Sequence, residues 1–159
     1  MTDVRSKVLR ALGATLVLAT LALAVAALAG AFEGKPEGPA PIAWDHETCA
    51  ECHMHIGDPS YAAQIRTADD RVASFDDPGC LFRYLEREAP EVHAMYFHHS
   101  EEDRWLTRDQ VAFLPVPGDR TPMSYGLAAV DSGTPGAVGF EAAYRRVTNE
   151  ELHADGGEQ

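Results

Sequence analysis

An uncharged run of 22 residues, from Ala11 to Phe32, sets the first limit on how this chain folds. The run is long enough to cross a bilayer as one helix, and Arg5, Lys7 and Arg10 precede it. Because basic flanks stay on the cytoplasmic side, the rest of the chain is expected outside the cytoplasmic membrane, in the cell envelope. We therefore predict that residues 1–32 are a signal peptide or a membrane anchor.

The remaining chain divides by composition into three parts. Residues 33–43 contain three prolines and two glycines and are predicted to be an extended linker. Residues 44–148 have the mixed composition of one folded domain, and residues 149–159 form a polar tail. If the helix is retained, it attaches this domain to the membrane; if it is cleaved, the domain is released.

The charge balance excludes one class of partner. Asp and Glu number 25 against 13 Lys and Arg, which leaves a net charge of -12. Such a surface repels phosphate backbones, so a nucleic acid is not an expected partner. No catalytic triad, carboxylate pair or phosphate-binding loop stands out in the sequence, and we do not expect an enzyme.

Local patterns in the first half of the domain predict a hairpin, a helix and a further strand. Strand-like residues 61–66 and 71–76 flank a turn at Asp69-Asp70. Asp77-Pro78 is a typical helix start, and the apolar spacing continues the helix to Glu88. Cys80 lies in the first turn, where the helix dipole is expected to lower its pKa. Residues 92–98 read as the next strand, with His98 and His99 at its end.

The second half of the domain repeats this order of elements. Strand patterns at 105–106, 111–116 and 124–130 precede a Pro/Gly turn and a helix over 140–147. We therefore predict an α+β fold made of two small β-β-α-β-like repeats with mostly antiparallel sheets, preceded by the N-terminal hydrophobic helix.

The stretch from Cys49 to Ile56 is the predicted functional centre. It holds two thiols, two imidazoles and a thioether, and the only other cysteine is Cys80. An odd number of cysteines in an exported chain fits a binding site better than a set of disulfides. Thiolates and thioethers prefer soft ions, so the stretch indicates a soft-metal site. A Cys49–Cys52 disulfide beside a buried Cys80 is the alternative.

Two other cofactors also fit parts of this stretch. Cys49-x-x-Cys52-His53 is the attachment string of c-type haem, with Met123 or Met95 as a sixth ligand. The small number of predicted helices argues against a cytochrome. A structural zinc site would use the three cysteines and one histidine, although the usual second C-x-x-C pair is missing.

A Cu(I) site is the third interpretation. Cys52-x-Met54 would place a thiolate and a thioether on one face of an extended segment. A thioether carries no proton and forms no disulfide, which suits metal binding outside the cytoplasm. An exposed site with few ligands can exchange them one at a time with a partner, as metal transfer requires.

Several motifs together resemble the NosL family, in the same order and with similar spacing. They cover the chain from about Cys49 to Val147, and the matching segments are Cys49–Ile56, Tyr61–Ile65, Phe75–Cys80, Trp105-Leu106 and Thr121–Leu127. The family usually has glycine where this chain has His53, and many members carry a lipidated cysteine that this chain lacks.

The resemblance implies a copper-binding accessory protein of the kind associated with nitrous oxide reductase assembly. It implies that Cu(I) is held by Cys52, Met54 and Met123, with Cys49 and His53 as further candidate ligands. The expected function is that of an extracytoplasmic Cu(I) chaperone. Its expected partner is a copper-receiving metalloprotein or a membrane assembly complex.

Overall fold

The computed structural model describes residues 18–25 and 37–154. The chain divides into two units, Met1–Glu37 and Gly38–Gln159. In the first unit, residues 18–25 are helical and present exposed apolar side chains. No helix within the described part of the chain is both long and apolar enough to cross a membrane. Most of the predicted signal peptide or anchor lies outside the described residues, and its role remains a prediction.

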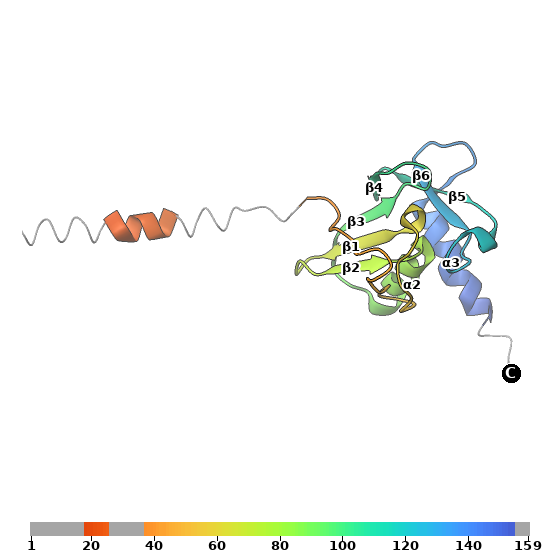
Figure 1. Ribbon diagram of the computed structural model, residues 1–159, viewed down its shortest axis with the longest axis horizontal. Coiled ribbons are helices and arrows are strands. Elements are labelled where there is room, and N and C mark those ends of the chain that lie inside the picture. Colours follow the sequence, from red (N-terminus) through yellow and green to blue (C-terminus); the bar gives the residue numbers. More distant parts are fainter. Residues whose placement is uncertain (1–17, 26–36, 155–159) are drawn as a thin grey trace, which may run out of the picture. The chain divides into compact units, whose positions relative to one another are not determined.

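The first half of the second unit forms a four-stranded antiparallel sheet (Figure 1). Its strands are β1 (Ala63–Thr67), β2 (Val72–Phe75), β3 (Val92–His98) and β4 (Trp105–Thr107), in the order β2-β1-β3-β4. Helix α2 (Pro78–Glu88) connects β2 to β3. The predicted hairpin, helix and third strand are therefore confirmed.

The second half forms a three-stranded antiparallel sheet. It consists of β5 (Val111–Pro115), β6 (Leu127–Asp131) and β7 (Val138–Gly139), in the order β6-β5-β7, and α3 (Phe140–Ala154) follows β7. In both sheets the first strand of the half lies in the middle. The third strand follows the helix in the first half but precedes it in the second.

The predicted α+β class with two small antiparallel sheets is confirmed, with three local differences. The first is the short strand β7, which was not predicted. The predicted strand over 124–130 begins only at Leu127, because Ser124 and Gly126 adopt positive φ angles of 63° and 64° and form a turn. The helix predicted over 140–147 continues to Ala154, into the predicted polar tail.

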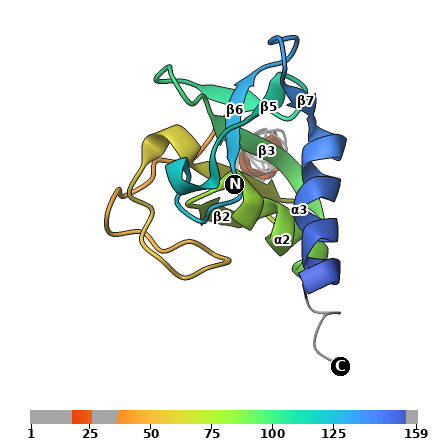
Figure 2. The same cartoon turned by 90° about the vertical axis from the view of Figure 1, so that its right-hand side faces the viewer.

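The two helices α2 and α3 pack against each other (Figure 2). An aromatic cluster joins them to both sheets. Phe82 of α2 is fully buried at the centre of this cluster. Its ring lies within 6.1 Å, centroid to centroid, of rings from β3, β5 and α3, which belong to Phe97, Phe113, Phe140 and Tyr144. The cluster fixes the position of α2, which carries Cys80.

The last residues of the predicted linker lie against the first sheet. The backbone N–H of Gly38 donates to the hydroxyl of Tyr96 at 3.1 Å, and that of Ala40 donates to Oε1 of Gln64 at 2.6 Å. Gln64 is a buried polar residue of β1, and the contact from Ala40 satisfies the oxygen of its side-chain amide. Both contacts also fix the start of the loop that leads to Cys49.

Candidate metal centre

The structure brings the three cysteine sulfurs together. The Sγ atoms of Cys49, Cys52 and Cys80 all lie within 4.8 Å of one another, and no disulfide joins them. Cys49 and Cys80 are fully buried, whereas Cys52 is half-buried. Three sulfurs bound to one ion at about 2.3 Å in a plane lie about 4 Å apart. The triad therefore has the dimensions of a three-sulfur metal site that opens toward solvent at Cys52.

A tight loop positions the first two cysteines. The backbone N–H of Cys49 donates to the carbonyl of Met54 at 2.8 Å, and that of His53 donates to the carbonyl of Cys49 at 3.1 Å. Ala50 is tied to β2 through the carbonyl of Ser74. The chain turns at residues 50–52, so this segment is not the extended strand on which the pairing of Cys52 with Met54 was predicted.

Cys80 reaches the site from the first turn of α2. Asp77 caps this helix by accepting the N–H of Gly79 at 2.8 Å, and Pro78 occupies the first helical position. Both signals were readable in the sequence, and they place Cys80 in the first turn, two residues after Pro78. The folded domain thus joins two local motifs that lie about thirty residues apart.

Hydrogen bonding sets the charge of the cysteine triad. The thiol of Cys80 donates to the sulfur of Cys49, and the backbone N–H groups of Cys52, Asp76 and Glu51 donate to it too. These bonds outweigh burial and lower the pKa of Cys49 to about 5. The predicted lowering of the Cys80 pKa is wrong. Its role as the donor in that bond, and then its burial, raise the pKa of Cys80.

Burial is also the main reason why the pKa of Cys52 is raised. The metal-free triad therefore holds one thiolate, on Cys49, and two thiols at neutral pH. A thiolate is the form that binds metal, and binding through all three sulfurs would release the protons of Cys52 and Cys80. The lowered pKa of Cys49 thus favours a thiolate in the triad before a metal binds.

The other predicted ligands lie at the edge of this region. Met54 is 59% exposed, and it is the next residue but one after Cys52. His53 is exposed and adopts a φ of 62°, a left-handed conformation that costs a residue with a side chain about 1–2 kcal/mol. Met123 is partly buried against the core. The ligand atoms that the structure gathers are therefore those of the three cysteines.

Asp77 links the loop of Met123 to the start of α2. Its second carboxylate oxygen accepts the backbone N–H of Met123 at 3.1 Å. The same loop also packs against Gly79, where an added Cβ would lie 2.1 Å from the ring of Tyr125. The backbone of Met123 is thus held beside the helix turn that carries Cys80.

Burial raises the pKa of Asp77 to about 6. The folded protein then binds more protons than the unfolded chain between about pH 4 and 6, so this group lowers the free energy of unfolding as the pH rises. The loss is at most about 3 kcal/mol. The lowered pKa of Cys49 has the opposite effect, because it raises the free energy of unfolding as the pH rises above about 5. The contribution of Asp77 is therefore measured as a difference between two variants that share Cys49.

We expect Asp77→Asn to gain stability relative to the unmodified protein as the pH rises from 4 to 6.5, and the difference to become constant above that. Urea unfolding of the reduced, metal-free protein at each pH measures it. A difference that stays the same at every pH would contradict the assignment of this titration to Asp77.

A second group of metal-binding side chains does not form a comparable site. His99, Glu102 and Asp131 offer atoms within 4.8 Å of one another. Arg104, however, pairs with both carboxylates, at 2.5 Å in each case. Nδ1 of His99 accepts two backbone N–H groups at 3.1 Å, so Nε2 carries the proton of the neutral ring and faces Asp131. An ion-pair network explains this cluster.

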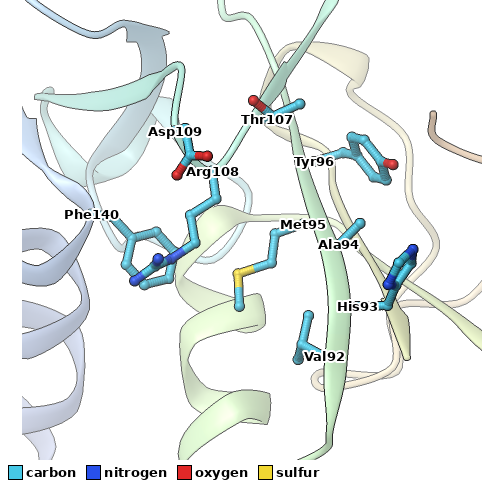
Figure 3. A pocket seen from close by; sticks show the side chains of 9 residues that line it. All are labelled: Val92, His93, Ala94, Met95, Tyr96, Thr107, Arg108, Asp109 and Phe140. Carbon is cyan, nitrogen blue, oxygen red and sulfur yellow. The ribbon is translucent and has the colours of Figure 1, made fainter. Parts of the chain in front are cut away.

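A cavity of 480 Å³ lies elsewhere in the domain (Figure 3). Met95 from β3, Arg108 from the turn after β4 and Phe140 from α3 reach into it. The guanidinium of Arg108 stacks 4.6 Å from the centre of the Phe140 ring and pairs with Glu141. Its charge is thus already compensated, and the cavity has no cluster of reactive groups that resembles the cysteine triad.

Comparison with protein-family models, curated proteins and solved structures finds no match for this chain. The site must therefore be interpreted from its own chemistry. From the sequence, Cys80 was considered only as a zinc ligand or a buried residue. Glu51, which lies between the first two cysteines and pairs with Arg83 and Arg87 of α2, was not predicted to take part in the site. The signal for it was that both arginines follow Cys80 on the same face of the predicted helix.

Proposed function

We propose that the domain binds Cu(I) through Cys49, Cys52 and Cys80 and passes it to a protein partner outside the cytoplasm. The supporting observation is a compact group of three sulfurs in which one is half-buried and two are fully buried. Soft thiolates favour Cu(I) over harder ions. Partial burial protects the ion from water, and the accessible sulfur of Cys52 provides a point at which a partner can begin ligand exchange.

The composition of the triad favours copper over zinc. Structural zinc takes four ligands from the protein, whereas the group contains three cysteines and no histidine or carboxylate among the described residues. Cu(I) accepts lower coordination numbers, and thioethers can supplement them. Zinc remains the alternative if a fourth ligand comes from His53 or from water.

Burial argues against covalent haem at Cys49-x-x-Cys52-His53. Cys49 is fully buried and its sulfur accepts hydrogen bonds from Cys80 and from three backbone groups. Bonding this sulfur to a porphyrin would break those bonds and open the core around it. The exposed His53 could ligate an iron only above that surface.

The two methionines fit a role in transfer. Met54 is exposed beside the half-buried Cys52, and Met123 lies on a loop fixed to the helix of Cys80. A thioether binds Cu(I) without a proton to lose, so it can take or release the ion while the thiolates exchange. In this proposal Met54 meets the incoming partner, and Met123 completes the coordination from the other side.

A NosL-like role is the form of this proposal that the sequence resemblance suggests. One observation supports it: the position where that family usually has glycine is His53, whose φ of 62° is one that glycine adopts without strain. The partner would then be a copper-receiving metalloprotein, such as nitrous oxide reductase, or a membrane assembly complex. Export of the domain by the N-terminal segment belongs to the same proposal.

The full chain, produced in a host that exports proteins and attaches haem, tests these alternatives. We expect a colourless protein that binds one Cu(I) per chain in competition with bathocuproine disulfonate under reducing, anaerobic conditions. A covalently retained Soret band would instead identify a cytochrome. Tightly bound zinc with no competitive Cu(I) binding would identify a structural zinc domain.

A further inference from the structure

A buried carboxylate lies between the two cysteines of the loop. The side chain of Glu51 is only 8% exposed, and it points toward α2. Its Oε1 lies 3.4 Å from Nε of Arg83, and its Oε2 lies 2.9 Å from a terminal nitrogen of Arg87. A carboxylate buried to this extent without cations would be costly. The two arginines therefore determine where this part of the loop rests.

The arginines share a helix face with the third cysteine. Arg83 and Arg87 follow Cys80 by three and seven residues, which places all three side chains along one side of α2. The face that supplies the third thiol is thus the face that holds Glu51. The ion pairs of Glu51 with Arg83 and Arg87 therefore determine how closely the loop that carries Cys49 and Cys52 approaches Cys80.

Glu51 is connected to the triad by its backbone as well. Its N–H group is one of the donors to the sulfur of Cys49. Oε1 accepts a hydrogen bond from Nε of Arg83, whereas Oε2 meets Arg87 as an ion pair without an aligned hydrogen bond, so charge attraction and one hydrogen bond hold the side chain. Movement of the side chain away from α2 would turn the peptide groups on both sides of Glu51.

We infer that Glu51 is a positioning residue of the metal centre, which holds Cys49 and Cys52 against Cys80 by pairing with Arg83 and Arg87. The effect on metal affinity rests on the proposed function, whereas the positioning of the cysteines does not. Glu51 does not touch the ion, because its carboxylate faces the arginines. Without the ion pairs, the loop would keep its two cysteines but would lose its register with the helix.

The first test measures Cu(I) affinity in the full chain. Changes in outer residues that orient metal ligands typically lower affinity 10–100-fold, and we expect a loss of about that size for Glu51→Gln. Glu141→Gln is the matched control. It makes the same change of charge on a different helix, α3, and it also removes a carboxylate that pairs with an arginine, Arg108. The control is expected to retain its affinity within about twofold.

The second test needs no metal. Mild oxidation of the reduced protein with diamide, followed by peptide mapping, reports which cysteines meet. In the unmodified protein, Cys80 should enter an intramolecular disulfide in a substantial share of molecules. Glu51→Gln should shift the products toward Cys49–Cys52, and Glu141→Gln should not. A failure of Cu(I) binding in the unmodified protein would overturn the proposed function but leave this test intact.

Arg87→Gln keeps the experiment decisive if Glu51→Gln does not fold, because Arg87 is half exposed and its loss removes one of the two ion pairs. We expect a smaller shift in the same direction. The inference is overturned if a folded Glu51→Gln or Arg87→Gln variant, judged by its circular dichroism and melting temperature, gives the unmodified pattern of disulfides.

Discussion

Replacing Cys80 by serine is expected to lower the Cu(I) affinity of the protein by a factor of about 10²–10⁴. Structural zinc sites bind their ion with about 10–16 kcal/mol, which is about 3–5 kcal/mol for each of three or four ligands. We take this as the scale for one thiolate, and 1.4 kcal/mol corresponds to a factor of ten. Serine has nearly the same shape as cysteine but offers a hard oxygen. Competition with bathocuproine disulfonate measures the change.

The matched controls replace the methionines that the family resemblance assigns as ligands. Met54→Leu together with Met123→Leu keeps apolar volume and removes both thioethers. If the cysteine triad is the main site, this double variant should lose less affinity than Cys80→Ser and should exchange the ion more slowly with a thiol acceptor. The opposite order, with Cys80→Ser unaffected, would restore Cys52, Met54 and Met123 as the ligand set.

Local signals in the sequence were sufficient for most of the fold. The turn at Asp69-Asp70 and the cap at Asp77-Pro78 act on neighbouring residues, and both appear as predicted. The two-residue strand β7 is too short for any alternation of apolar residues to be visible. Its pairing with β5 is decided by tertiary packing, which explains why this strand was not predicted.

The site was only half predictable for a related reason. The clustering of soft donors at Cys49–Ile56 is a property of consecutive residues, so it could be recognised directly. The approach of Cys80 depends on how α2 lies against the loop, which in turn depends on buried contacts between distant residues. The raised pKa of Cys80 follows from the same contact, because its thiol donates to the sulfur of Cys49 and is buried.

Phe82→Ala is expected to lower the free energy of unfolding by about 3–5 kcal/mol, as truncation of a fully buried phenylalanine typically does. The ring of Phe82 packs on rings from β3, β5 and α3, so no single neighbour can move to fill the space. For a domain of this size we expect the melting temperature to fall by about 10–25 °C. Urea unfolding and thermal denaturation of the metal-free protein measure both quantities.

Phe82→Leu is the control, because it keeps most of the apolar volume and should cost clearly less than the alanine variant. Phe82 lies two residues after Cys80 in the same buried core, but its ring packs on the aromatic rings of β3, β5 and α3. At a temperature where Phe82→Ala is folded, its Cu(I) affinity should therefore stay within a few-fold of the unmodified protein. A loss of affinity equal to that of Cys80→Ser, in a variant that is still folded, would show that the aromatic cluster and the cysteine triad are one cooperative unit.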